Sequence, residues 1–336
     1  MEMTSARESI NTGILPAVSF VLPTLNAQGY LGRCLKSIRS QDYPSEKLEI
    51  IVADGGSKDD TLAIAAKYAC RVIPNPKVLH DSGVSLALRE SGADIRFIFA
   101  ADNELPGRDW VRLMIKPFQR DSGVYGAFPG VVSPRQDDSV NRYFNLTHCD
   151  PFSWFVFHNE ADPRLFSKAY KIRDNSGDYV IYDFPVKRYP MIGFSQGFAV
   201  RKDFFRKPEN ASDDILPVIQ MIEEGKKIAY VPGALIYHWH LKGFKSFLKK
   251  YGQRIEDNIN SRNYGYIGRG KYLSLRRKIR QYLWVIYSLT LVFPVIDALR
   301  GVFKDRDAAW LWHPAANLCL AWMVIIKLMR KEFVAR

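Results

Sequence analysis

The sequence lacks the cysteine patterns that mark zinc sites and disulfide-stapled folds. Its 336 residues contain four widely spaced cysteines with no CxxC pair, namely Cys34, Cys70, Cys149 and Cys319. Scattered thiols argue against a zinc site or a disulfide framework and fit a reducing, cytoplasmic compartment. The first sixteen residues also lack the apolar run of a signal peptide, and we expect them to form a flexible tail.

Two nucleotide-binding signatures are missing as well. No GxGxxG sequence follows a predicted strand, which argues against a nicotinamide-dependent dehydrogenase. No glycine-rich loop with a basic residue follows the first predicted strand, which disfavours a nucleotidyltransferase on a related α/β fold. Hydrophobic residues nevertheless make up 47% of the chain, so it can bury a sizeable core.

Acidic residues are scarce near the C-terminus. The formal net charge is +13, and residues 242–280 hold twelve Lys or Arg against only Glu256 and Asp257. A basic block can bind nucleic acid, anionic lipid or a phosphorylated ligand. Because this block runs directly into an apolar region, we expect an anionic membrane surface, and no nucleic acid, as its partner. A merely solvated basic face is the alternative.

Apolar runs alternate with amphipathic patterns in the first hundred residues. The predicted strands are 18–22, 48–53, 70–73 and 95–100, and the predicted helices are 29–40, 59–68 and 82–91. This alternation predicts an α/β fold with parallel strands. Ligands bind beyond the carboxyl ends of such strands, where acidic clusters around residues 54 and 102 lie.

The second half is less regular. Residues 120–190 have no clear period, and we expect irregular structure there. Beyond them the sequence predicts strands at 193–200 and 227–231, a helix at 213–224 and a basic amphipathic helix at 239–251.

Two apolar segments, 282–296 and 308–326, lie near the C-terminus. They fit a transmembrane hairpin, two helices lying in the membrane interface, or a helical subdomain packed on the main domain. Lys and Arg lie before, between and after the segments, so the positive-inside rule does not choose among these structures.

Five short elements, in a particular order, carry the chemistry. They are the run 18–26 ending in Pro-Thr-Leu-Asn, Asp-Gly-Gly-Ser-Lys-Asp-Asp-Thr at 54–61, the helical stretch 83–94, Phe-Ala-Ala-Asp-Asn-Glu at 99–104, and Asp-Asp at 213–214 with Gly225 and Tyr-Val-Pro at 230–232. In this order and spacing, over about residues 17–250, the chain resembles the inverting family 2 glycosyltransferases of the GT-A fold.

The resemblance implies a Rossmann-like mixed sheet flanked by helices and followed by a helical, membrane-associated region. The expected divisions are a tail at 1–16, a GT-A domain at 17–240, a basic connector at 241–280 and an apolar membrane region at 281–336. Within the GT-A domain, 17–119 would bind the nucleotide sugar and 120–240 the acceptor.

The resemblance also assigns donor contacts. The Asp at position 54 would accept a hydrogen bond from the base, usually uracil, and the neighbouring glycines would let the backbone approach. A glycine turn before an N-capped helix is the alternative interpretation of this element. The expected donor-binding residues are Pro23, Thr24, Asn26, Asp54, Gly55, Ser57, Arg89, Ala101 and Asp102.

The family's metal motif is altered in this chain. An Asp-x-Asp pair is usual there, but Ala100 replaces the first Asp and only Asp102 keeps its register. We expect Asp102, Glu104 and His238 to hold Mn²⁺ or Mg²⁺, because hard cations prefer carboxylate oxygens. The loss at position 100 leaves open a degenerate, inactive site.

The resemblance places the catalytic base at Asp214, with Asp213 in place of the usual Glu. Inverting transfer needs a carboxylate that deprotonates the acceptor hydroxyl. The same two acids would also cap helix 213–224, and both roles are compatible. Expected acceptor contacts are Gln196, Gly197 and Trp239.

These expectations describe a metal-dependent inverting glycosyltransferase with a nucleotide-diphosphate sugar as donor, UDP-linked by preference. The acceptor would be a lipid-linked glycan, a polyprenyl-diphosphate-linked one in cell-envelope polysaccharide synthesis, at the cytoplasmic face of the membrane. A polyprenyl-phosphate sugar synthase and a catalytically decayed membrane scaffold are the alternatives.

Overall fold

The computed structural model describes residues 15–206, 213–260 and 270–334, so most of the expected tail at 1–16 lies outside the described residues. The chain forms two compact units that interleave along the sequence. The first unit comprises residues 1–130, 170–184 and 192–237, and the second comprises 131–169, 185–191 and 238–336.

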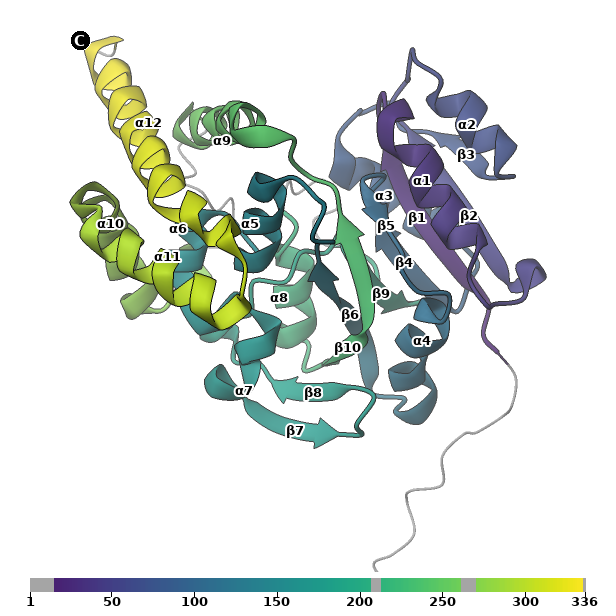
Figure 1. Ribbon diagram of the computed structural model, residues 1–336. Coiled ribbons are helices and arrows are strands. Elements are labelled where there is room, and N and C mark those ends of the chain that lie inside the picture. The colour runs from purple at the N-terminus through teal and green to yellow at the C-terminus, as the bar shows by residue number, and fades with distance from the viewer. Residues whose placement is uncertain (1–14, 207–212, 261–269, 335–336) are drawn as a thin grey trace, which may run out of the picture. The chain divides into compact units, whose positions relative to one another are not determined.

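The first unit begins with four parallel strands, in the order β3-β2-β1-β4. These are β1 (Val18–Thr24), β2 (Leu48–Asp54), β3 (Arg71–Pro74) and β4 (Ile95–Phe99). The connecting helices are α1 (Gln28–Arg39), α2 (Thr61–Lys67) and α3 (His80–Glu90) (Figure 1). All residues of β1 and β4 are buried, as their uninterrupted apolar runs predict.

The sheet continues beyond β4 in the order β9-β6-β10-β8-β7, with β4–β9, β9–β6, β10–β8 and β8–β7 as antiparallel pairs, and β5 (Asn103–Glu104) pairs with β10 off this path. The bounds are β6 (Val124–Val132), β7 (Lys171–Asn175), β8 (Val180–Asp183), β9 (Gln196–Arg201) and β10 (Lys227–His238). Helices α4 (Trp110–Arg120) and α8 (Leu216–Glu223) complete this unit. The predicted mixed α/β sheet is confirmed.

The prediction of irregular structure at 120–190 is wrong. Besides three strands, this stretch contains α5 (Ser139–Thr147), α6 (Pro151–Phe157) and α7 (Phe166–Ala169). All five residues of β7 are exposed, so the strand shows no alternation of apolar and polar residues. The three helices are nine residues or fewer, too short for a helical period to stand out.

The second unit is helical. Its remaining helices are α9 (Gly243–Asn260), α10 (Leu275–Thr290), α11 (Val292–Asp305) and α12 (Trp312–Val334). Their buried faces form one core with α5, whose members include Tyr143, Phe247, Trp284, Trp310 and Leu320. The expected helix at 239–251 begins only at Gly243, because β10 continues to His238.

The two apolar C-terminal segments behave differently. The first is divided between α10 and α11, which meet at an angle of 89° at Leu291. The second forms a single stretch, Ala308–Arg330, which by length and composition is apolar enough to cross a membrane.

Candidate active site

The carboxyl ends of β1 and β2 meet at Thr24 and Asp54, which are register partners in the sheet. Asp54 is buried, and its carboxylate accepts four hydrogen bonds. Oδ1 accepts from the Thr24 hydroxyl at 3.0 Å and the Ser57 hydroxyl at 2.5 Å, and Oδ2 accepts from the backbone N–H groups of Gly56 and Ser57, both at 2.8 Å. Internal donors therefore fill the usual acceptor capacity of a carboxylate.

These hydrogen bonds fix the charge of Asp54. Burial raises the pKa of Asp54, but the hydrogen bonds from Ser57, Gly56 and Thr24 outweigh it and hold the pKa below its ordinary value. The carboxylate is thus an anion that organises the β2–α2 loop.

Asn26 joins the β1–α1 loop to the β2–α2 loop. Its backbone N–H donates to the Ser57 hydroxyl at 2.9 Å, and its Oδ1 accepts from the N–H of Lys58 at 3.0 Å. Asn26 has a φ of 50°, a left-handed conformation that Asn tolerates better than most residues. Pro23 lies close to α3, since a Cβ at Gly83 would come within 2.9 Å of the Pro23 Cβ.

The turn after β4 carries Asp102 and is held by Ser195. The carbonyl oxygen of Ser195 accepts from the N–H of Ala100 at 3.1 Å and from Asn103 Nδ2 at 3.2 Å. Glu104 lies 3.8 Å from the Arg33 guanidinium in an exposed ion pair. The expected metal motif is therefore positioned by a residue outside that motif.

Asp213 and Asp214 have different surroundings. Asp213 is buried, and its Oδ1 accepts from the N–H groups of Ile215 at 2.7 Å and Leu216 at 3.1 Å, at the start of α8. Asp214 is partly buried, and its Oδ1 accepts from the Ser195 hydroxyl at 2.8 Å. The capping role expected for the pair therefore falls to Asp213.

A histidine faces Asp214. One ligand-type atom from each of His80, Asp81 and Asp214 lies within 4.8 Å of the other two. Desolvation lowers the pKa of His80, but Asp81 and Asp214 outweigh it and raise the pKa above its ordinary value. Asp81 also forms an ion pair with the buried Arg206, so this group is balanced by a fixed cation.

The expected acceptor residues on β9 directly follow Ser195, the hydrogen-bond partner of Asp214. Gln196 is the first residue of β9, and Gly197 follows with a φ of 75°. A Cβ at Gly197 would lie 3.1 Å from both Pro129 Cγ and Trp110 Cζ2. Gly197 therefore meets a steric as well as a conformational demand. Arg89 lies in the last turn of α3 and is exposed.

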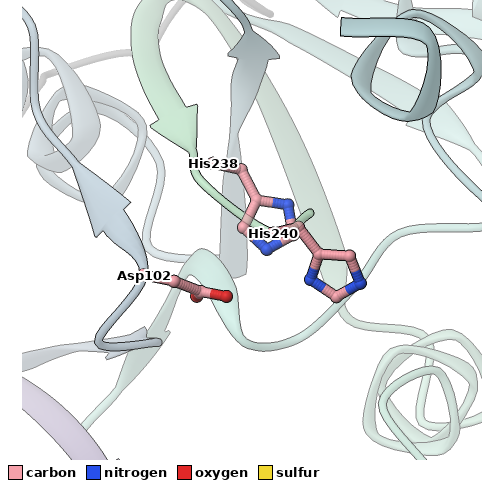
Figure 2. Close-up of side chains that lie close together, drawn as sticks. All are labelled: Asp102, His238 and His240. Carbon is pink, nitrogen blue, oxygen red and sulfur yellow. The ribbon is translucent and has the colours of Figure 1, made fainter. Parts of the chain in front are cut away.

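His238 ends β10 and is the first residue of the second unit. Its carbonyl oxygen accepts from Asn141 Nδ2 at 2.8 Å and Asn145 Nδ2 at 2.9 Å, both on α5. The rings of His238 and His240 are 4.6 Å apart, with Trp239 between them in sequence. Figure 2 shows the two histidines at the end of the β10 arrow and beyond it, and Asp102 on its own turn.

Sequence reasoning missed Ser195, His80 and Arg206. Ser195 precedes an expected acceptor residue by one position, but a single serine carries no spacing signal. His80 begins a helix and Arg206 lies in a loop, so only the tertiary structure brings His80 to Asp214 and Arg206 to Asp81.

The comparisons with known proteins decide the family. The model of "Glycosyl transferase family 2" matches residues 19–188, slightly more than half of the 336 residues. The chain belongs to glycosyltransferase family 2. This family 2 chain is 22% identical over 324 residues to a Methanococcus voltae enzyme, dolichyl N-acetyl-alpha-D-glucosaminyl phosphate 3-beta-D-2,3-diacetamido-2,3-dideoxy-beta-D-glucuronosyltransferase, covering 88% of this chain and 91% of the relative.

Two further likenesses are informative for this glycosyltransferase. A Campylobacter jejuni GalNAc(5)-diNAcBac-PP-undecaprenol beta-1,3-glucosyltransferase is 44% identical, over only 50 residues that cover 15% of this chain and 16% of the relative. The structure of a Pyrobaculum calidifontis mannosyltransferase in complex with GDP-Man and Mn²⁺ superposes with a TM-score of 0.52 at 16% identity, covering 95% of this chain and 88% of that chain. The fold is therefore that of the GT-A glycosyltransferases.

Proposed function

We propose that this family 2 glycosyltransferase moves a sugar from a nucleotide-diphosphate sugar, UDP-linked by preference, to a polyprenyl-linked glycan, with inversion at the anomeric carbon. The observation that carries the proposal is the arrangement of Asp214. It is partly buried at the start of the segment leading into α8, and it accepts a hydrogen bond from Ser195, which also holds the turn of Asp102.

The acceptor class is supported by the activities of two relatives. The Methanococcus enzyme acts on a dolichyl-phosphate-linked sugar, and the Campylobacter enzyme acts on an undecaprenol-diphosphate-linked glycan. Both names describe addition to a sugar that is already attached to a lipid. A cytoplasmic membrane face, where nucleotide sugars and such lipids meet, is the corresponding location for this chain.

In the proposed reaction Asp214 is the general base. The acceptor hydroxyl attacks the anomeric carbon while its proton passes to an Asp214 oxygen, and the bond from that carbon to the nucleoside diphosphate breaks on the opposite face. Asp213 acts differently, because its Oδ1 already binds two backbone N–H groups. We assign Asp213 to holding the Asp214 backbone in place.

The proposed donor contacts lie in the β1–α1 and β2–α2 loops, which Asn26 joins. Asp54 is fully hydrogen-bonded, so a base that donates to it must replace one of the present donors. The Ser57 hydroxyl is the donor that can rotate away, whereas the backbone N–H groups are fixed. Pro23, Thr24, Asn26 and Gly55 would then form the loop surface that faces the nucleotide, and Ala101 would lie nearer the diphosphate. The structure does not support the expected role of Arg89, because it lies in the last turn of α3, where its neighbour Glu90 pairs with Arg71 at the start of β3.

We propose that Asp102, with Glu104 and His238, holds Mn²⁺ or Mg²⁺. The donor set fits such an ion, because carboxylate oxygens suit both metals and imidazole is a common additional ligand for transition metals. When bound, the cation would neutralise the charge that develops on the leaving diphosphate. Gln196, Gly197 and Trp239 are proposed as acceptor contacts.

The proposal is tested by incubating the purified full chain with UDP- and GDP-sugars, a polyprenyl-diphosphate-linked glycan, and either Mn²⁺ or chelator. We expect metal-dependent transfer that Asp214→Asn lowers by about 10²–10⁴-fold with donor binding retained. Asp42→Asn, which removes an exposed acid paired with Arg112, is the matched control and should leave turnover unchanged. Lack of binding to every donor would overturn the proposal in favour of a scaffold. Transfer only to free polyprenyl phosphate, giving an acid-labile product, would favour the synthase.

A further inference from the structure

The helices α10 and α11 each expose a row of apolar side chains. On α10 the exposed residues recur every three or four positions, at Leu275, Ile279, Tyr282, Ile286 and Leu289. On α11, beyond the bend, a second row with similar spacing comprises Val292, Ile296, Leu299 and Phe303. Ile286 is 62% exposed and Phe303 is 80% exposed, values far from those of a packed core. We call these nine residues the α10–α11 face.

This face is unusual within the protein. More than half of the large hydrophobic side chains that are exposed in the described residues lie between Leu275 and Leu311. Exposed apolar side chains concentrated in one segment mark interaction sites, since soluble surfaces normally carry such residues singly. The opposite faces of the same helices are packed, with Trp284, Tyr287 and Ala298 buried.

Helix α12, in contrast, belongs to the core of the second unit. It packs against α9, α10 and α11, and Ala316, Leu320 and Ala321 are fully buried. Two buried polar residues of α12 are satisfied by the bundle. His313 bonds the Tyr143 and Tyr287 hydroxyls, both at 2.9 Å, and Asn317 accepts from Trp284 Nε1 at 2.9 Å.

The second half of α12 also has a protein partner. Lys327 forms an ion pair with Glu256 of α9, a helix whose exposed side chains include Lys249, Lys250 and Arg254. A spanning helix needs about twenty residues in contact with lipid or other spanning segments, and a helix as charged as α9 cannot accompany it into hydrocarbon. The bundle therefore explains the apolar side chains in the first half of α12, whereas Trp322, Ile326 and Met329 in its second half are exposed.

Charge around the α10–α11 face favours an anionic partner. Residues 275–306 contain seven Lys or Arg and two acids, and all of these cations except Arg277, which is buried and paired with Glu160, have some exposure to solvent. Both acids have cationic partners, because Asp297 pairs with Arg300 and Asp305 pairs with Arg164. Arg276 and Lys278 are exposed in the first turn of α10, next to Leu275 and Ile279. An apolar stripe edged by cations is the composition of helices that lie in the interface of anionic membranes.

We propose that the protein is monotopic, with the α10–α11 face lying in the interface of an anionic bilayer and α12, held to α9 and α10 by its first half and by Lys327, not crossing that bilayer. This proposal concerns how the enzyme reaches its lipid-linked acceptor, and it rests on the proposed function only for its biological purpose. Lipid binding itself needs neither donor nor acceptor, so the two proposals fail separately.

The experiment measures binding of the full chain, free of detergent, to vesicles of phosphatidylcholine with about 30% phosphatidylglycerol. A double variant, Ile286→Glu with Phe303→Glu, places two carboxylates on the face. We expect it to bind at least about tenfold more weakly, while Leu62→Glu, an exposed apolar position on α2, binds like the native chain. Both variants should retain the native melting temperature and the native rate of donor hydrolysis.

Two further readouts distinguish the alternatives. Membranes that contain the protein are washed with alkaline carbonate, and we expect the protein to be released. Resistance to the wash would overturn the proposal in favour of a spanning helix. Unchanged vesicle binding by the double variant would also overturn the proposal. If light scattering showed that the native chain is a dimer and the double variant is not, while lipid binding stayed the same, the α10–α11 face would contact a second copy and the proposal would be overturned as well.

Discussion

The Ser195 hydroxyl donates a hydrogen bond of 2.8 Å to Asp214 Oδ1, while the carbonyl oxygen of the same serine accepts from Ala100 and Asn103. One residue thus joins the proposed base to the turn that carries Asp102. Nothing in the sequence around Asp102 or Asp214 indicates this connection.

Replacing Ser195 with Ala should slow turnover without weakening donor binding. A hydrogen bond to a charged group contributes about 1.5–3 kcal/mol, so we expect kcat to fall by roughly 10–100-fold. Ser195→Thr keeps the hydroxyl and should restore most of the rate. Steady-state kinetics with varied donor provide the measurement. A rise in donor KM equal to the fall in kcat would show that Ser195 acts in binding rather than in positioning the base.

Replacing Ser57 with Ala should leave donor affinity within about threefold of native. In our proposal the nucleotide base takes the place of the Ser57 hydroxyl as a hydrogen-bond donor to Asp54, so the hydroxyl is not needed when the donor is bound. Asp54→Asn should weaken donor binding by more than about tenfold, since the anionic acceptor is lost. Asp42→Asn, at an exposed acid paired with Arg112, is the control and should bind the donor like the native chain. Calorimetric titration with UDP checks all three variants. If Ser57→Ala were as damaging as Asp54→Asn, the hydroxyl would itself be a ligand of the nucleotide.

The buried His313 should make folding sensitive to mild acid. Burial lowers the pKa of His313 to about 3, whereas an unfolded histidine titrates near 6.5. Between these values the unfolded chain binds the additional proton, so the stability contribution is complete above about pH 6.5 and declines as the pH falls. By pH 5 the loss should reach about 2 kcal/mol.

Thermal melts at pH 7.5 and pH 5 test this expectation. Carboxylates titrate in the same experiment, so the native chain is compared with His313→Gln, which keeps a polar side chain but cannot be protonated. The variant should be less stable at pH 7.5 yet lose less on acidification. Equal losses in the two proteins would assign the acid sensitivity to other groups, of which Asp297, bonded to Tyr287 beside His313, is the nearest.

Replacing Gly301 with Ala should destabilise the second unit, although Ala is normally the better residue in a helix. A methyl group at Gly301 on α11 would overlap the indole ring of Trp310. Overpacking of this kind costs about 1–3 kcal/mol. Gly29→Ala on α1 is the matched control, because a Cβ there meets no atom within 4 Å. Denaturant unfolding should show a loss for Gly301→Ala and a small gain for Gly29→Ala.

The sequence predicted the parallel half of the sheet well. β1, β2 and β4 are buried on both faces, so each appears as an uninterrupted apolar run, and Asp54 and Asp102 follow their strands as expected. The rest of the sheet was harder, because β7 is exposed on both faces and β9 begins three residues later than predicted.

The C-terminal region shows a limit of a different kind. Hydropathy registers how apolar a segment is, but not whether protein or lipid covers it. Residues 308–326 were a transmembrane candidate on composition, yet His313 and Asn317 are hydrogen-bonded inside the bundle. The sharp bend lies at Leu291, which has a φ of 57°. A glycine would have indicated this left-handed conformation in the sequence, but a leucine stands there.

The interleaving of the two units has a consequence for synthesis. Helices α5 and α6 leave the ribosome about a hundred residues before α9–α12, which complete their core. Tyr143 and Phe144 on α5 therefore remain unpacked while β7–β10 are being made. A chain that stops after residue 240 would leave both side chains without their core partners, so the first 240 residues should aggregate instead of yielding a soluble catalytic fragment.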